Sequence, residues 1–169
     1  PAGTVHCSGA DTMVLEISAT PYIFTFKLWD WGRVDLDGKP RPIHLEHGAA
    51  NIQWYRNTEW VHRNLVNAVA EVYTGENGTV VRTGLHEREF LDTFRFTTSS
   101  ALPVHRNGSV HMLNLVDGTR AVLRSKSDAF LPLELHYAET CIVPQAAGDY
   151  EIYSPDGSEV KVILACVRN

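Results

Sequence analysis

The residue with the clearest chemical potential stands near the start of the chain. Residues 1–6 (PAGTVH) form a tight Pro/Gly turn that delivers a histidine, and a strand-like run follows at residues 12–17. Turns of this kind place metal-binding imidazoles at the mouths of small β-barrels. His6 is therefore a candidate zinc ligand, although a zinc site takes at least three protein ligands and His6 is a single local donor. The alternative is a turn histidine bonded to the backbone.

A second group of metal-ligand types comprises His44, Glu46 and His47. On an extended strand His44 and Glu46 would share one face and form a ligand pair. Glu46 also begins a predicted helix, where the helix dipole stabilises a carboxylate, and we expect the helix. The remaining histidines, including His105 and His111, show no spacing that argues for chemistry. We expect them to be structural or exposed.

Three cations are candidates for contact with an anionic substrate. Arg33 follows an aromatic-rich strand end, a place suited to a fixed guanidinium that binds a sugar oxyanion or a phosphate. The alternative for Arg33 is an exposed ion pair with Asp30 or Asp35. Lys27 and Arg41 would add phosphate affinity, with surface solvation as the alternative for both.

The composition is that of a soluble globular protein of 169 residues with a net charge of −5. No basic stripe is present, which argues against a nucleic-acid surface. No apolar run is long enough to span a membrane. Three widely separated cysteines predict neither a disulfide framework nor a CxxC metal site, and they favour a reducing cytoplasm.

The first half of the chain mixes strand and helix patterns. The predicted elements are strands at 12–18 and 22–28 and a short helix at 45–52. A firmer helix begins with Asn57 or Thr58 as its N-cap, continues with apolar residues on one face as far as Val72, and ends by Gly75. This stretch is the least β-like part of the protein and is expected to bridge two β regions.

The second half reads as short strands separated by turns. Strands are expected at 90–97, 110–116, 150–154 and 160–167. The turn sequences between them are Asn107-Gly108, Asp117-Gly118 and Pro155-Asp156-Gly157. Short strands at this spacing without helices indicate an antiparallel sandwich or barrel of the jelly-roll kind.

Residues 1–6 resemble the second conserved motif of the cupin fold. Further segments resemble the class I, cupin-type mannose-6-phosphate isomerases of bacteria, and they are 14–17, 26–33, 37–46, 139–144 and 148–150. The resemblance runs through the whole chain and implies a mainly β, cupin or jelly-roll β-sandwich with a short helical linker. Its implied parts are the last strands and active-site loop of a catalytic cupin (1–44), the linker (45–84) and a C-terminal cupin-like domain (85–169).

The resemblance also implies an activity and its residues. The family interconverts mannose 6-phosphate and fructose 6-phosphate with zinc or another divalent metal. His6 matches its zinc-binding histidine, and Arg33 matches an active-site arginine. The other metal ligands lie in the family's N-terminal half and have no counterparts here. We therefore expect this chain to be the C-terminal portion of such an isomerase, inactive by itself, with a phosphorylated hexose and the missing N-terminal half as partners.

Two other interpretations stay open. Asp149 follows Pro144 by five residues, as His6 follows Pro1, which predicts that the same corner recurs with a carboxylate in place of the imidazole. This substitution favours a non-catalytic sugar-binding or regulatory cupin. An apolar edge left where N-terminal strands should pair would instead favour a structural domain that completes a homo-oligomer. Neither interpretation involves nucleic acid or a membrane.

Overall fold

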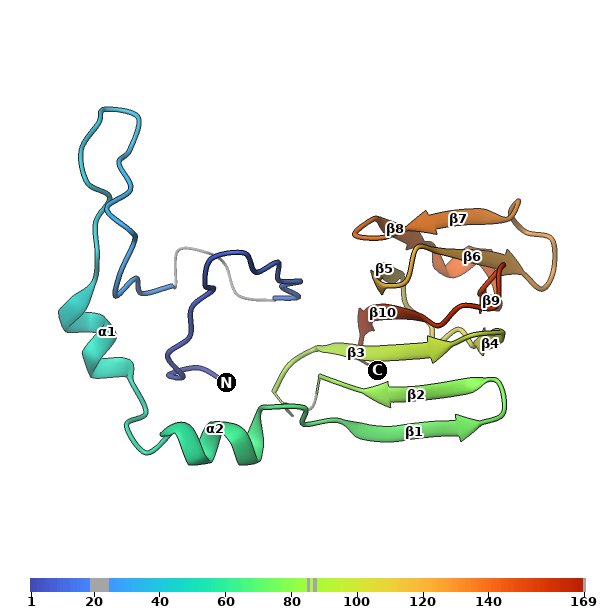
Figure 1. Cartoon of the computed structure of the whole chain (residues 1–169), viewed down its shortest axis with the longest axis horizontal. Coiled ribbons are helices and arrows are strands. Elements are labelled where there is room, and N and C mark those ends of the chain that lie inside the picture. Colours follow the sequence, from blue (N-terminus) through green and yellow to red (C-terminus); the bar gives the residue numbers. More distant parts are fainter. Residues whose placement is uncertain (19–24, 85, 87, 169) are drawn as a thin grey trace. The chain divides into compact units, whose positions relative to one another are not determined.

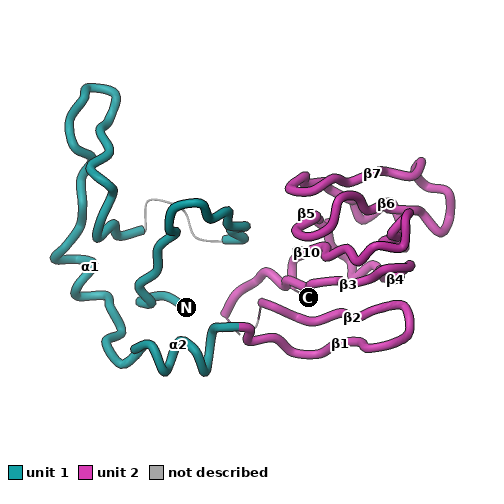
Figure 2. The backbone as a smooth tube through the Cα atoms, in the orientation of Figure 1, with its two compact units in different colours: residues 1–66 teal, residues 67–169 magenta. Residues whose placement is uncertain are grey.

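The computed structural model describes residues 1–18, 25–84, 86 and 88–168. The chain divides into two compact units, unit 1 (residues 1–66) and unit 2 (residues 67–169), shown in Figure 2. Unit 1 carries the helices α1 (Leu45–Asn51) and α2 (Thr58–Asn64), and unit 2 carries the strands. In the described ranges, no helix is both long and apolar enough to cross a membrane.

Unit 2 is built from two antiparallel sheets (Figure 1). The larger sheet has the order β1 (Ala70–Gly75), β2 (Gly78–Arg82), β3 (Leu91–Thr98), β10 (Val160–Val167), β5 (His111–Asp117), β8 (Thr140–Val143). The smaller sheet has the order β4 (Ala101–Val104), β9 (Tyr150–Tyr153), β6 (Arg120–Ser125), β7 (Leu133–His136). A short 3-10 helix, η2 (Gln145–Ala147), precedes β9. The predicted fold class, a mainly β antiparallel sandwich, is confirmed.

The apolar core of unit 2 joins side chains from both sheets. Its members with no measurable exposure are Leu113, Leu115, Ala121, Leu123, Tyr150, Ile152, Val160 and Val162. Burying one such aliphatic side chain stabilises the fold by roughly 1.5–3 kcal/mol relative to its exposed state. The strand β10 lies at the centre, because it pairs with β3 on one side and with β5 on the other. The core therefore specifies how the sheets stack.

The predicted strands and turns of the second half are confirmed in β3, β5, β9 and β10. The turn glycines Gly108, Gly118 and Gly157 all have positive φ angles, of 84°, 93° and 75°. At Gly118 a Cβ atom would also lie 2.9 Å from the Glu159 carbonyl oxygen. Glycine is required there by both conformation and space.

The two helices of unit 1 begin where the sequence predicts them, but the second is shorter than expected. The helix α2 ends at Asn64, whereas the pattern predicts a helix to Val72; residues from Ala70 onward form β1 instead. This prediction is wrong because β1 pairs with β2 through a hairpin that Gly78 closes. Pairing with a neighbouring strand outweighed the helical spacing of the apolar residues.

The predicted strand at residues 12–18 is also wrong. These residues have no regular secondary structure, and Met13 and Val14 are 68% and 66% exposed. A strand needs a neighbour for its backbone hydrogen bonds, and no described residue of unit 1 provides one. Of the second predicted strand, 22–28, residues 22–24 lie outside the described residues, and 25–28 are not a strand. The predicted functional division into 1–44, 45–84 and 85–169 stays a prediction.

Candidate functional site

The turn that carries His6 has a defined conformation. The Thr4 N–H donates to the Pro1 carbonyl oxygen at 3.2 Å, and Gly3 has a φ of 82°. The Gln53 N–H donates to the Gly3 carbonyl oxygen at 2.9 Å. A Cβ atom on Gly3 would lie 2.7 Å from the Asn51 carbonyl oxygen. The turn thus docks on the segment between α1 and α2 through a position that only glycine fits.

Arg56 also holds this turn through hydrogen bonds. Its Nη1 donates to the Pro1 carbonyl oxygen at 3.1 Å, to the Ala2 carbonyl oxygen at 2.5 Å and to Thr4 Oγ1 at 2.8 Å. The guanidinium also lies over the rings of Tyr55 and Trp60, at 5.4 and 5.1 Å from their centroids. This arginine, which the sequence analysis did not single out, is the positioning residue of the turn. Its place directly before the Asn57 N-cap gave no signal of that role.

His6 is exposed, and its ring has a fixed hydrogen-bonding partner. Nδ1 lies 3.2 Å from the Thr4 carbonyl oxygen, which can only accept, so Nδ1 carries the proton. In the neutral tautomer that makes this bond, Nε2 carries the lone pair. Metal-binding histidines commonly use this arrangement, in which one ring nitrogen donates to a backbone carbonyl while the other binds the metal. The geometry suits the predicted ligand role without testing it.

The residues of this chain do not by themselves fit a zinc ion. Among residues 1–18, 25–84, 86 and 88–168, no group of three or more His, Cys, Asp or Glu side chains is placed to hold a metal. A zinc site needs at least three protein ligands. His6 would have to be one ligand of a set completed by residues outside this chain.

Three cations surround one buried carboxylate, and we call Lys27, Asp30, Arg33 and Arg41 the Asp30 cluster. Arg41 binds both carboxylate oxygens of Asp30, through Nε at 2.5 Å and Nη2 at 2.8 Å. Lys27 Nζ lies 3.5 Å from Asp30 and Arg33 Nη1 lies 3.9 Å from it. The hydrogen bond from Arg41 is the main cause that lowers the pKa of Asp30. One carboxylate cannot neutralise three cations, so the cluster keeps a positive surplus.

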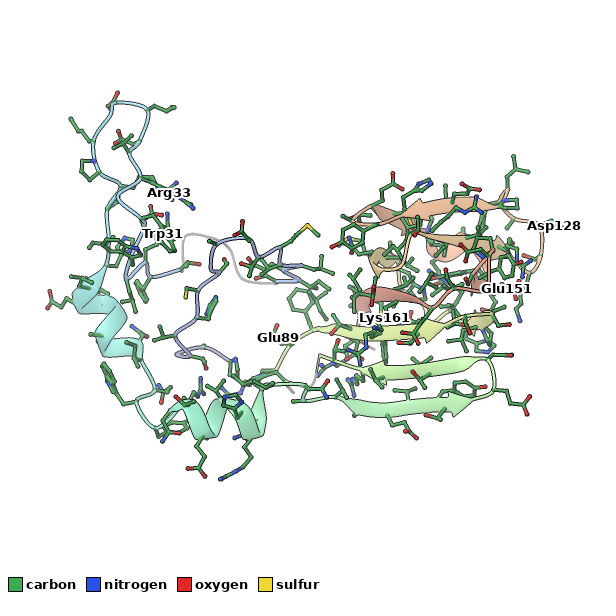
Figure 3. The ribbon with its side chains drawn as sticks, in the orientation of Figure 1. Trp31, Arg33, Glu89, Asp128, Glu151 and Lys161 are labelled. Carbon is green, nitrogen blue, oxygen red and sulfur yellow. The ribbon has the colours of Figure 1, made fainter. Side chains whose placement is uncertain are left out.

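The loop before α1 projects Arg33 into solvent (Figure 3). Trp31 and Gly32 both have positive φ angles, of 56° and 66°, and the Arg33 N–H donates to the Asp30 carbonyl oxygen at 2.9 Å. A left-handed residue other than glycine costs about 1–3 kcal/mol, so the turn at Trp31 is a strained feature. The Arg33 side chain is 62% exposed, which leaves its guanidinium available to a ligand.

A hollow of about 420 Å³, here called the Arg33 hollow, lies beside this side chain. Its lining residues are Ser8, Gly9, Ala10, Thr12, Trp31 and Arg33. Hydroxyl groups, an aromatic ring and a guanidinium are the groups that bind sugars and their anions. The structure thus brings Arg33 together with the segment that directly follows His6. His6 itself, Lys27 and Arg41 are not among the lining residues.

The second predicted group of metal-ligand types, His44, Glu46 and His47, has structural roles. His44 Nδ1 accepts from the Lys27 N–H at 3.2 Å, and the His44 N–H donates to the Lys27 carbonyl oxygen at 2.6 Å. Glu46 lies in the first turn of α1, as the helix prediction requires. His47 stacks on the Phe26 ring at 6.0 Å. These contacts tie the loop to α1.

Asp149, the carboxylate at the repeated corner of unit 2, is fully engaged. Its Oδ1 accepts from the Arg106 N–H at 2.9 Å, and its Oδ2 lies 2.8 Å from His105 Nδ1. The hydrogen bond from the Arg106 backbone, followed by the one from His105, lowers the pKa of Asp149. The sequence analysis did not foresee this His105–Asp149 pair, because the two residues are far apart along the chain.

Among known proteins, this chain resembles solved structures only at the level of the fold. No protein-family model and no curated protein matches the chain. Among solved structures, the mannose 6-phosphate isomerase of Bacillus subtilis is similar at 13% identity and a TM-score of 0.59, over 83% of this chain and 39% of the enzyme. Vicilin from hazelnut (Corylus avellana) matches at 12% identity and 0.48, over 59% of this chain and 31% of vicilin. A Cupin 2 conserved barrel domain protein from Salinispora arenicola matches at 11% identity and a TM-score of 0.45, over 57% of this chain and 80% of that protein.

The match to the Bacillus subtilis enzyme reaches beyond unit 2. A share of 83% of 169 residues is about 140 residues, which exceeds the 103 residues of unit 2, so part of unit 1 is included. The chain spans 39% of the length of that enzyme. Since the identity is low, the likeness concerns the fold. The chain has the cupin fold.

Proposed function

We propose that this chain is the C-terminal part of a metal-dependent aldose–ketose isomerase that interconverts mannose 6-phosphate and fructose 6-phosphate. The observation that carries the proposal is the Arg33 hollow. An exposed guanidinium there shares its lining with residues 8–12, which directly follow His6. The fold likeness to the Bacillus subtilis isomerase supports the proposal because it extends into unit 1.

The reaction moves a proton between C1 and C2 of the sugar and builds negative charge on an oxygen of an enediol-like intermediate. A guanidinium that is fixed before the reaction stabilises such a charge without reorganisation. The left-handed turn at Trp31 and the N–H bond to the Asp30 carbonyl oxygen fix the backbone of Arg33, and hence the position from which its exposed guanidinium would reach the substrate. A divalent metal, held by His6 and by ligands from outside this chain, would supply Lewis-acid polarisation of the sugar oxygens.

The Asp30 cluster suits a phosphorylated substrate. Lys27, Arg33 and Arg41 carry three positive charges around one carboxylate, and the surplus would attract a phosphate dianion. Arg41 donates two of its N–H groups to Asp30, so we assign it mainly to holding the cluster together. Lys27, with a 3.5 Å contact to Asp30, is the more adaptable phosphate ligand.

The exposed apolar residues of unit 1 fit the same proposal. Met13 and Val14 lie in an irregular segment with no strand neighbour among the described residues, and both are more than half exposed. Apolar patches of this kind mark surfaces that another part of a protein covers. In the proposed enzyme, strands of the catalytic cupin would pair with residues 12–18 and cover them.

The test is a coupled isomerase assay on the protein extended toward its N-terminus to include a whole catalytic cupin. Arg33→Ala should lower kcat by about 100-fold or more, the usual cost of removing a group that stabilises a transition-state charge. His6→Ala should abolish activity together with tightly bound metal. Arg63→Ala is the matched control, because Arg63 on α2 is 70% exposed and pairs only with Glu59 among the described residues. Wild-type activity in both His6→Ala and Arg33→Ala would refute the proposal.

The second candidate function is a non-catalytic sugar-binding or regulatory cupin. The observation in its favour is the engagement of Asp149 by His105 and Arg106, which leaves the second corner of the fold without a metal ligand. Metal analysis of the extended protein separates the two functions. One tightly bound divalent ion per chain supports the isomerase, and none under metal-replete conditions supports the binding protein.

A further inference from the structure

Unit 2 contains a cavity of about 400 Å³ between its two sheets. The residues that line it all belong to unit 2, and the strands β1, β2 and β3 that form one wall are adjacent in the larger sheet (Figure 1). Val80 and Phe96 lie on that wall, Leu102 faces them from β4, and Leu164 contributes from β10. The volume is within the range of small-molecule pockets, which is about 300–1,000 Å³.

The chemistry of this wall excludes a phosphorylated sugar. Hydrocarbon and aromatic side chains dominate the lining, and it contains no Lys, Arg, Asp or Glu. A phosphate dianion moved into such a wall would lose its hydration without gaining a partner. An uncharged apolar molecule would instead exchange water for apolar contacts. The lining therefore selects against charge.

Besides Tyr73 and Cys166, three polar residues lie among the lining residues, and two of them, Asn107 and His111, are bonded to each other. The Tyr150 hydroxyl lies 2.9 Å from His111 Nδ1, and Asn107 Oδ1 lies 3.0 Å from His111 Nε2. The Ser109 N–H donates to Asn107 Oδ1, which fixes that atom as the amide oxygen and His111 Nε2 as a donor. Burial and the nearby Arg106 charge lower the pKa of His111 to about 4, so the ring is neutral. Neither nitrogen of His111 has capacity left for a ligand.

The third polar residue, His105, has that capacity. Its Nδ1 lies 2.8 Å from Asp149 Oδ2, and the Arg106 N–H holds the same carboxylate at 2.9 Å. Because the carboxylate can only accept, Nδ1 carries a proton, and the Asp149 contact orients the ring so that Nε2 can bond to a ligand hydroxyl. In the part of the chain that the structure describes, Nε2 makes no hydrogen bond. His105 is three-quarters exposed, so it stands at the rim of the cavity.

We propose that this cavity binds a small, uncharged, mainly apolar molecule that carries a hydroxyl group, with the hydroxyl hydrogen-bonded to His105 Nε2. An alkylphenol represents the class. The apolar body is selected by the wall of β2, β3, β4 and β10, and the hydroxyl is selected by the oriented imidazole. The site is independent of the proposed isomerase reaction, because it uses no residue of unit 1.

The test uses the 169-residue chain and two probes, 4-propylphenol and its methyl ether 4-propylanisole, in calorimetric titrations; the ether has the same apolar body but cannot donate a hydrogen bond. The phenol should bind at one site per chain and should not be displaced by mannose 6-phosphate. Val72→Trp should abolish binding of both probes by filling the cavity from its edge, where Val72 is 56% exposed and folding is not at risk. Thr74→Trp is the matched control, since it adds the same ring to β1 at a residue that does not line the cavity.

His105→Phe separates the hydroxyl from the apolar body. It should weaken 4-propylphenol roughly tenfold, the upper range for one lost hydrogen bond, and leave 4-propylanisole unchanged. Circular dichroism at matched concentrations checks that each variant is folded. The absence of saturable phenol binding to the wild-type chain would overturn the proposal, and so would equal binding by wild type and Val72→Trp. Equal losses of both probes in His105→Phe would overturn the assigned hydrogen bond.

Discussion

The two units of this chain are stabilised in different ways. Unit 2 closes around side chains such as Leu113 and Ile152, which have no measurable exposure. In unit 1 the only buried residues among those described are Asp30 and Gly48, and Trp29, Trp31 and Trp54 are all more than 60% exposed. Unit 2 therefore depends on apolar burial, whereas unit 1 depends on hydrogen bonds, ion pairs and stacking around single residues.

The difference teaches where a ligand can be held in each unit. The charged groups of the Asp30 cluster lie at the surface of unit 1, where a phosphate can reach them with its hydration partly intact. The cavity of unit 2 lies inside a packed sandwich and offers apolar contacts with one oriented imidazole. Anionic and uncharged ligands are thus separated between the units. Substitutions should affect the two units differently, and four experiments test this.

The largest effect is expected from the core of unit 2. Leu113→Ala should lower the free energy of unfolding by roughly 2–5 kcal/mol, because it removes buried methyl groups and leaves a cavity between β5 and β10. Val14→Ala in unit 1 should change it by less than about 0.5 kcal/mol, since that side chain is exposed. Urea unfolding followed by far-UV circular dichroism measures both. Similar losses in the two variants would mean that unit 1 also depends on apolar burial.

The second effect concerns pH and the buried His111. Burial and then the Arg106 charge lower its pKa from 6.5 to about 4 in the folded state. Between these two values the unfolded chain binds a proton that the folded chain rejects, so stability falls as the pH falls from 6.5 toward 4. The slope should reach about 1.4 kcal/mol per pH unit, and the total loss should be at most roughly 3 kcal/mol.

Urea titrations of wild type and His111→Gln at pH 7, 6 and 5 measure this loss. The glutamine cannot titrate, so the free energy of unfolding of the variant should fall by up to about 1.4 kcal/mol less per pH unit than that of wild type. The carboxylates that also titrate in acid are the same in both proteins and cancel in the comparison. Parallel curves for the two proteins would show that His111 takes up its proton in the folded state.

The third effect is local to the His6 turn. Arg56→Met leaves an unbranched apolar side chain beside Tyr55 and Trp60 but removes the guanidinium, and with it the bonds to the Pro1 and Ala2 carbonyl oxygens. Amide exchange at Gln53, whose N–H donates to Gly3, should accelerate about tenfold, which corresponds to roughly 1.4 kcal/mol. Arg63→Met is the control, because its side chain pairs with Glu59 alone among the described residues. Equal exchange in both variants would remove Arg56 as the positioning residue.

Much of unit 2 could be predicted from its sequence because its signals are local. Gly108, Gly118 and Gly157 mark turns, and a short apolar run between turns, such as residues 160–167, predicts a buried strand. The hairpin of β1 and β2 was missed because Val72 and its neighbours also fit a helical face. Only the pairing with Val80 and Val81 across Gly78, which is a long-range property, decides between the two structures.

The candidate site was predictable in its members but not in its connections. His6 and Arg33 stand out by residue type and turn context, and the structure places Arg33 beside the residues that follow His6. Sequence alone gave no sign that Arg41 would bind both oxygens of Asp30, since eleven positions separate them. The roles of Arg56 and His105 also depend on contacts between distant residues, and such contacts leave no local pattern.

The smallest effect is expected at the N-cap of α2, where Asn57 Oδ1 accepts from the Trp60 N–H at 3.0 Å. Asn57→Ala should cost about 1 kcal/mol, the usual value for a lost cap. Asn57→Asp is the matched control, since it keeps a side-chain oxygen that can accept from the Trp60 N–H. All four tryptophans lie in unit 1, so their fluorescence reports unit 1 while the strand signal in circular dichroism reports unit 2. Asn57→Ala should shift the fluorescence transition in urea alone. A joint shift of both signals would mean that the two units unfold together, and the contrast between them would then describe packing and not independent stability.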